Sequence, residues 1–174
     1  MALYFNNLEV ESSERKKTLQ IIEAMNRGIR QEIFSNLSYI SVNHFDTTKH
    51  NKELTNYIRK HPLKRNTIFM TYLNSEQVIR NINPIIFSYV NMESESVDER
   101  VMNINSYPDS NFTTRKTRIR IAQYLMNLDY ISNALTFQED CLKKNRSDKF
   151  INEELGDGEV VLKFSKSRFH KITY

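Results

Sequence analysis

The sequence predicts a single α+β domain of 174 residues, in which a small mixed β-sheet packs against amphipathic helices. Two patterns predict this class. Short runs rich in β-branched and aromatic residues have the length of strands, and they alternate with longer stretches in which apolar residues recur every three or four positions. The composition, with 39% hydrophobic and 26% charged residues, is that of a folded domain that buries its own core without disulfides or a structural metal.

Four runs are predicted as strands: 37–45, 67–73, 84–90 and 160–164. The two central runs are almost continuously apolar, which is typical of strands that are buried on both faces. A short helical pattern lies between them and is capped by Asn74 or Ser75. Strand, helix and strand in this order predict a compact crossover unit.

Three further helices are expected. The first begins at Ser12 or Ser13 and carries apolar residues at helical spacing as far as Ile33. A short second helix ends at His61, because the next residue is proline. The longest helix covers about 114–145 and starts after a pair of threonines that can cap it.

Two segments fall outside this pattern. Residues 1–11 form an apolar N-terminal arm, in which Tyr4 and Phe5 need a surface to pack on. Residues 92–114 are predicted as a long polar loop, with a turn at Pro108. A loop of this length in a small domain is usually functional or mobile, so both segments indicate contacts with a partner.

No pattern predicts catalysis, a metal site or a cofactor. Cys141 is the only cysteine, which excludes an internal disulfide and a zinc site built on several thiolates. His44 and Asp46 lie two residues apart, as a surface pair would, and no other carboxylate stands as near to a histidine. The chain also lacks glycine-rich phosphate loops and nucleophile motifs. We therefore expect a protein that is not an enzyme and has no small-molecule substrate.

The pair Pro108-Asp109 matches the start of a common nuclease pattern, but a turn explains the pair better. Ile86-Phe87-Ser88-Tyr89, followed by a polar loop and Thr114-Arg115-Lys116-Thr117-Arg118, resembles the N-terminal endonuclease domain of influenza-type polymerases. The metal ligands of that family are absent here. The resemblance implies an inactive nuclease-like domain.

Charge is concentrated in two places. Cations crowd the start of the long helix, where they oppose its dipole, and acidic residues open the polar loop. The proposed interaction residues are Arg115, Lys116, Arg118 and Arg120 in the basic cluster, Glu93, Glu95, Asp98 and Glu99 in the acidic segment, and Tyr4 and Phe5 in the arm. The basic cluster has three readings, which are contact with a nucleic-acid backbone, contact with the acidic segment of the same or a neighbouring chain, and a solvated surface.

The arm and the opposite charges favour a structural subunit that forms homo-oligomers and binds other assembly proteins. Ile33-Phe34-Ser35-Asn36-Leu37 and Asn83-Pro84-Ile85-Ile86-Phe87-Ser88-Tyr89 resemble parts of the tail terminator and tail completion proteins of contractile-tailed bacteriophages. That resemblance implies a small α/β domain that forms a hexameric ring at the end of a phage tail. The alternative is a viral nucleic-acid-binding or regulatory protein that uses the basic cluster.

The expected location is a cytoplasm, including that of an infected host, or a virion if the protein is viral. The N-terminus lacks the basic start and apolar run of a signal peptide, and no stretch approaches the roughly 20 apolar residues of a membrane helix. We therefore expect no contact with a membrane. The abundance of Asn, Ile, Lys and Tyr fits A/T-rich coding, as in many phages and viruses.

Overall fold

The computed structural model describes residues 2–43, 58–106, 114–156 and 159–166, and their regular structure is entirely helical. Side chains are described for these residues except 2–9, 37–43, 114–118, 159 and 162. The predicted α+β class is wrong, since no strand occurs in these ranges. The helices are α1 (Ala2–Asn43), α3 (Thr67–Leu73), α4 (Glu76–Asn81), α5 (Pro84–Ser106), α6 (Thr114–Lys143), α7 (Asp148–Glu154) and α8 (Glu159–Phe164).

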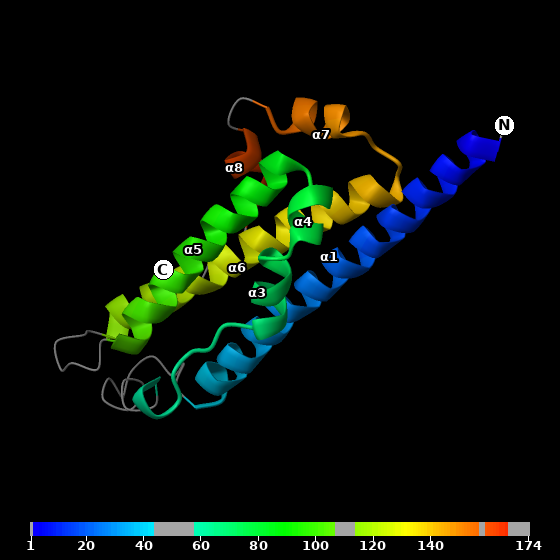
Figure 1. Ribbon diagram of the computed structural model, residues 1–174. Helices are drawn as coiled ribbons and strands as arrows, with labels where there is room; N and C mark the ends of the chain where they lie inside the picture. Colours follow the sequence, from blue (N-terminus) through cyan, green and yellow to red (C-terminus); the bar gives the residue numbers. More distant parts are fainter. Residues whose placement is uncertain (1, 44–57, 107–113, 157–158, 167–174) are drawn as a thin grey trace.

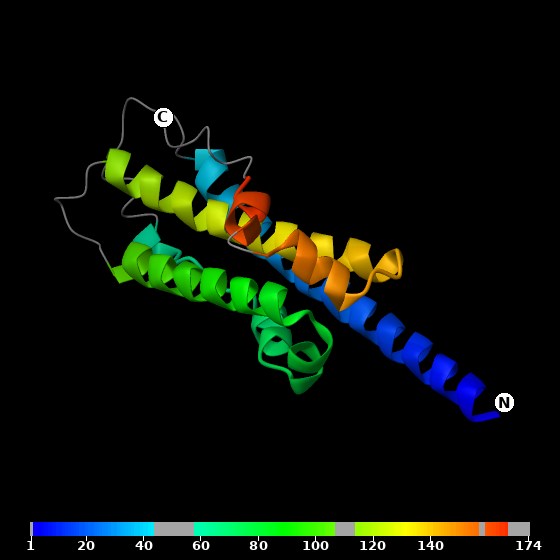
Figure 2. The same ribbon diagram turned by 90° about the horizontal axis from the view of Figure 1, so that it is seen from above.

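Three long helices form the body of the molecule. Figures 1 and 2 show α6 running antiparallel to both α1 and α5, which flank it. The short helices α3 and α4 pack along α1. Helix α8 packs on α5 and α6, and α7 lies beside it near the end of α6 (Figure 1). The described part is thus a helical bundle with short helices filling its sides.

The predicted strand 67–73 is helix α3. Its N-cap is Asn66, whose Oδ1 accepts a hydrogen bond from the Phe69 N–H at 3.1 Å. Phe69 and Leu73 are one turn apart and are both buried, while Ile68, which precedes Phe69, is 47% exposed. A short apolar run fits a strand or a buried helix equally well, so the cap is the local signal that distinguishes them.

The predicted strand 84–90 and most of the predicted loop 92–114 form one helix, α5. Pro84 occupies the first helical position, which suits its fixed φ, and the Asn83 Oδ1 accepts a hydrogen bond from the Ile85 N–H at 3.0 Å. The buried side chains then follow a helical period: Ile86, Tyr89, Val90, Glu93, Ser94, Val97 and Ile104. Residues 107–113 lie outside the described part.

The other two strand predictions are also wrong. The run 37–45 continues helix α1 as far as Asn43, and its last two residues lie outside the described part. The run 160–164 lies in α8, and the polar region before it contains helix α7. The predicted arm 1–11 is not a separate element, because α1 begins at Ala2 rather than at Ser12 or Ser13.

Two helix predictions are confirmed. Helix α6 covers Thr114–Lys143, close to the predicted 114–145. Helix α4 has the predicted cap, since the Ser75 Oγ accepts a hydrogen bond from the Val78 N–H at 3.3 Å. The predicted second helix falls mostly within 44–57, outside the described residues, although residues 58–60 are helical.

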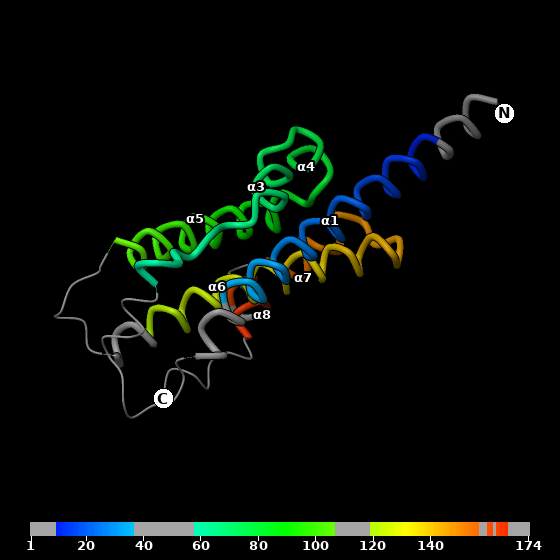
Figure 3. Tube along the Cα trace, turned by 90° about the horizontal axis from the view of Figure 1, so that it is seen from below, coloured from blue at the N-terminus to red at the C-terminus, as the bar shows by residue number. Residues whose placement is uncertain are grey.

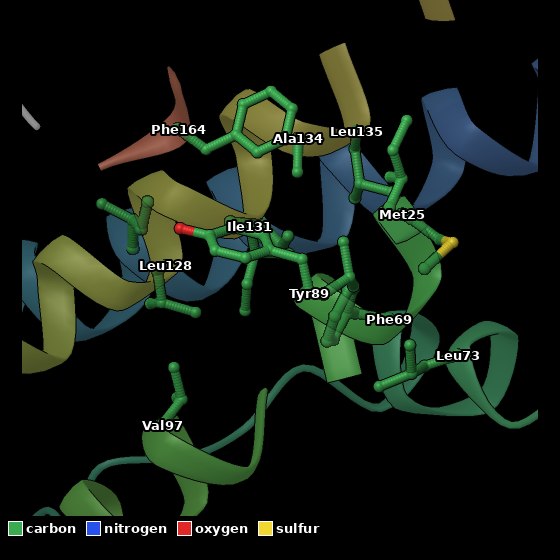
Figure 4. Packing of buried hydrophobic residues seen from close by; sticks show 14 of the residues in the cluster. Met25, Phe69, Leu73, Tyr89, Val97, Leu128, Ile131, Ala134, Leu135 and Phe164 are labelled. Carbon is green, nitrogen blue, oxygen red and sulfur yellow. The ribbon is translucent and has the colours of Figure 1, made fainter. Parts of the chain in front are cut away.

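The core lies where the helices meet, and Figure 4 shows labelled side chains of α1, α3, α5, α6 and α8 converging. Phe69, Ile131 and Met25 are fully buried there. The ring of Tyr89 lies 5.4 Å from that of Phe164, centroid to centroid, and joins α5 to α8. Burying aromatic side chains of this size contributes much of the stability of a small bundle.

Candidate functional site

The segment 58–66 lies along one side of the bundle, between α1 and α5. Asn36 of α1 donates from Nδ2 to the Lys64 carbonyl at 2.9 Å and accepts from the Lys64 N–H at 3.3 Å. Asn105 of α5 does the same for Leu63, donating at 3.0 Å and accepting at 2.9 Å. Two asparagine side chains therefore supply the partners that a neighbouring strand would give, and they fix this extended backbone in place.

A buried ion pair lies below this segment. Arg65 Nε is 3.2 Å from Glu32 Oε1, and the two side chains are 13% and 0% exposed. The pair is an electrostatic contact rather than an aligned hydrogen bond. The guanidinium Nη1 also pairs with Asp98 and donates to the Ser94 carbonyl at 3.1 Å. Arg65 therefore connects α1 to α5 through charge.

Glu32 accepts two further hydrogen bonds. The Asn66 N–H donates to Oε2 at 2.8 Å, and the Tyr124 hydroxyl of α6 donates to Oε1 at 2.9 Å. The Asn36 Nδ2 in turn donates to the Tyr124 oxygen at 2.7 Å. These residues, Glu32, Asn36, Arg65, Asn66 and Tyr124, are called the Glu32–Arg65 network below. It ties α1, α6 and the segment 58–66 together.

Burial dominates the protonation chemistry of the network. Desolvation raises the pKa of Glu32 above its ordinary value, and the Arg65 charge with the hydrogen bonds opposes this effect only in part. Burial also raises the pKa of the Tyr124 phenol, followed by the effect of the nearby Glu32 charge. Tyr124 therefore remains a hydrogen-bond donor at neutral pH, and the carboxylate is the group most exposed to a change in pH.

A pocket of about 290 Å³ opens above this network. Its lining residues come from α1 and from the segment 58–66, and they are Gln31, Glu32, Ser35, Asn36, Ile58, Lys60, His61, Pro62, Leu63, Lys64, Arg65 and Asn66. The floor is polar and already hydrogen-bonded, whereas Lys60, His61 and Lys64 are exposed at the rim. The pocket therefore presents cations toward solvent.

The described residues offer no other chemical centre. No three His, Cys, Asp or Glu side chains gather there as a metal site would require. Cys141 is buried, and burial raises the pKa of its thiol, as expected for a packed side chain. Among the described helices, none combines the length and apolarity needed to cross a bilayer.

The acidic residues predicted as one interaction segment lie on different sides of α5. Glu93 is buried and accepts a hydrogen bond from Asn127 of α6. Glu95 is exposed and accepts from Asn91 at 3.0 Å, while Asp98 pairs with Arg65. Glu99 is exposed. These four carboxylates do not form one surface patch, because a helix distributes neighbouring residues around its axis, and their role in binding a partner stays a prediction.

The basic cluster occupies the first turns of α6, and the arm occupies the start of α1. Arg115, Lys116 and Arg118 are in α6, but their side chains lie outside the described part. The same holds for Tyr4 and Phe5 in α1. Arg120 is half-buried, and its Nη1 is out of contact with solvent. The cluster thus does not present all four side chains freely.

The sequence analysis missed the Glu32–Arg65 network. Glu32 and Asn36 continue the buried stripe of α1 formed by Ile22, Met25 and Ile29, so a charged residue stands at a core position. A buried carboxylate needs a partner, and the basic run from Arg59 to Arg65 is rich in cations that can supply one. A charged residue at a position where the helical period predicts an apolar one is the signal that identifies such a site.

The fold and the site define a helical bundle with a charged internal clasp. Comparison with models of protein families, with curated proteins and with solved structures finds no match to this chain. Function is therefore argued from the geometry of the molecule alone.

Proposed function

We propose that the protein is a non-enzymatic assembly subunit that associates with further copies of itself through the projecting end of α1. The observation that carries this proposal is the exposure of residues 10–17. Seven of the eight side chains in this stretch are exposed and that of Arg15 is half-buried, so exposed positions lie on every side of the helix, and burial begins only at Thr18. Figure 3 shows α1 extending past the ends of the neighbouring helices at the start of this stretch, while Glu14 and Lys17 line a small cavity together with α4.

An isolated helical end of this kind is poorly stabilised. Asn7, Ser12 and Ser13 have low helix propensity, and most of the stability of a helix in a protein comes from the packing of its apolar face, which the exposed residues 10–17 do not have. Val10 is 56% exposed on this end. Packing against another chain would cover it and supply the tertiary contacts that usually stabilise a helix.

The charges of this segment favour a second copy as that chain. Glu11 and Glu14 precede Lys16 and Lys17, so the acidic part comes before the basic part. Two copies that cross antiparallel about a two-fold axis would place acidic residues of one opposite basic residues of the other. Such complementarity orients the association more than it strengthens it.

The other functional readings receive less support. The inactive-nuclease and tail-terminator resemblances both imply a domain built around a sheet, and the described residues contain no strand. The half-buried position of Arg120 weakens the nucleic-acid reading of the basic cluster. Viral or phage origin and a ring-shaped assembly stay predictions, and a hexameric mass would support the ring.

Charge reversal tests the proposal. We expect Glu11→Lys/Glu14→Lys and Lys16→Glu/Lys17→Glu each to weaken self-association about tenfold or more, because several exposed pairs at roughly 0.2–1 kcal/mol each become repulsive. Mixing the two variants should restore the complex, since the swapped charges are again opposite. Sedimentation velocity measures both effects.

The matched control for Glu11→Lys/Glu14→Lys is Glu95→Lys/Glu153→Lys, which makes the same change in net charge at two exposed sites on α5 and α7. It should associate like the unaltered protein. Self-association that survives both reversals would show that the end of α1 is not the interface. A monomer at every concentration would refute self-assembly itself.

A further inference from the structure

We infer that the pocket above the Glu32–Arg65 network binds a small phosphate monoester that carries an apolar or aromatic group. This site is independent of the α1 end used for assembly. It also departs from our expectation of a protein without small-molecule partners, although the ligand would be bound rather than transformed.

The pocket is lined by positive charge that the carboxylates of the described residues compensate only in part. Lys60, Lys64 and Arg65 line the pocket, and within the described residues the recorded carboxylate partners belong to Arg65 alone, through Glu32 and Asp98. The two lysines therefore leave the rim cationic. Two ammonium groups on one rim favour a doubly charged phosphate over a singly charged carboxylate, because Coulomb attraction scales with the charge of the ligand.

The backbone that carries these cations is held in place by hydrogen bonds. Asn36 holds both polar groups of Lys64, and Asn105 holds both polar groups of Leu63. The ordering of this segment is thus completed before any ligand arrives. A site that is ordered in advance loses less entropy on binding, which raises the affinity that a few contacts can reach.

The size and lining of the pocket also fit such a ligand. The volume of about 290 Å³ lies at the lower end of the range for ligand pockets, so it suits a small molecule rather than a macromolecule. Pro62 supplies an exposed apolar surface beside the cationic rim, and Ile58 and Leu63, each 6% exposed, line the pocket next to it. An anionic head with a flat apolar body matches these two surfaces together.

Calorimetric titration of the full chain tests the inference. The probes are phenyl phosphate, adenosine monophosphate, inorganic phosphate and benzoate. We expect saturable binding of the two phosphate esters, weaker binding of inorganic phosphate because it lacks the apolar body, and the weakest binding of benzoate. Lys60→Gln/Lys64→Gln should raise the Kd of phenyl phosphate at least tenfold.

The control Lys144→Gln/Lys149→Gln removes two exposed charges elsewhere and should leave the Kd unchanged. Circular dichroism verifies that each variant is folded. The inference fails if neither ester binds at concentrations up to about 10 mM. A Kd above that concentration corresponds to a binding free energy weaker than roughly 3 kcal/mol. It fails equally if the Lys60/Lys64 variant binds as well as the control. Binding of a 20-nucleotide single strand through these lysines, without binding of the esters, would assign the site to nucleic acid instead.

Discussion

Removing the carboxylate of Glu32 is the perturbation that most directly tests how the bundle is held together. In the Glu32→Ala variant, Arg65 loses its fully buried partner. The Asn66 N–H and the Tyr124 hydroxyl lose the acceptor that lies 2.8 and 2.9 Å away. The variant therefore combines a guanidinium that has lost its buried partner with two orphaned donors at one place.

The size of the effect follows from these losses. Breaking a buried ion pair by removing one partner typically costs about 3–5 kcal/mol. The lower end applies here, because Arg65 keeps Asp98 and its side chain is 13% exposed, so water can reach it from the pocket. We expect a loss of about 3 kcal/mol, which corresponds to a fall in Tm of roughly 6–12 °C for a domain of this size.

Urea denaturation followed by circular dichroism measures the loss. The midpoint should fall while the slope with denaturant stays constant, as expected when stability changes and the unfolded state does not. Glu76→Ala is the matched control, since its side chain is 77% exposed and pairs with Arg80 within α4; it should change stability by less than about 0.5 kcal/mol. A loss below about 1 kcal/mol for Glu32→Ala would refute the role of the network as a clasp.

Three further predictions follow from the same contacts. Burial raises the pKa of Glu32 in the folded state, so the unfolded state ionises first as the pH rises above the ordinary value of 4.5. Denaturation at a series of pH values should therefore show the wild type losing stability relative to Glu32→Gln until the pH passes the pKa of Glu32 in the folded state. A stability difference that does not depend on pH would contradict this. Asn83→Ala should cost about 1–3 kcal/mol in thermal unfolding, because the buried amide donates to both Asp148 and Asn152 at 3.0 Å; an unchanged Tm would contradict that link between α5 and α7. Gly28→Ala should lower the Tm despite the better helix propensity of alanine, because its Cβ would lie 2.8 Å from the Oδ1 of Asn66; a higher Tm would show that the α3 cap moves freely.

The sequence predicts a helix correctly where apolar residues keep the helical spacing over many turns. Helix α6 was predicted within two residues at its end, because its apolar positions recur over many turns. Helix α4 was predicted from the cap at Ser75. Long periodicity and a polar cap are local properties, so they can be recognised without knowledge of the fold.

The strand predictions failed where apolar runs are short. In 67–73 and 84–90 nearly every residue is apolar, so neither period stands out. The pair Asn83-Pro84 is a helix start in the structure, and the buried positions from Val90 to Ile104 continue the helical period beyond it. These signals are in the sequence, but the apolarity of the run outweighed them.

The site was harder to predict than the fold. The Glu32–Arg65 network joins residues that are far apart in sequence, with Tyr124 lying 92 positions from Glu32. Only the helix packing brings them together. A charged residue on the buried stripe of α1 could have been recognised as needing a partner, yet the choice of Arg65 over other cations depends on where the segment 58–66 lies.

The most direct test of the assembly proposal is the native mass of the unaltered protein, measured by light scattering over a range of concentrations at low and high salt. A monomer has a mass of 20.7 kDa. The account predicts a discrete multiple of this value that falls toward the monomer on dilution and at high salt, where exposed charge pairs are screened. A mass of one chain under every condition would contradict it.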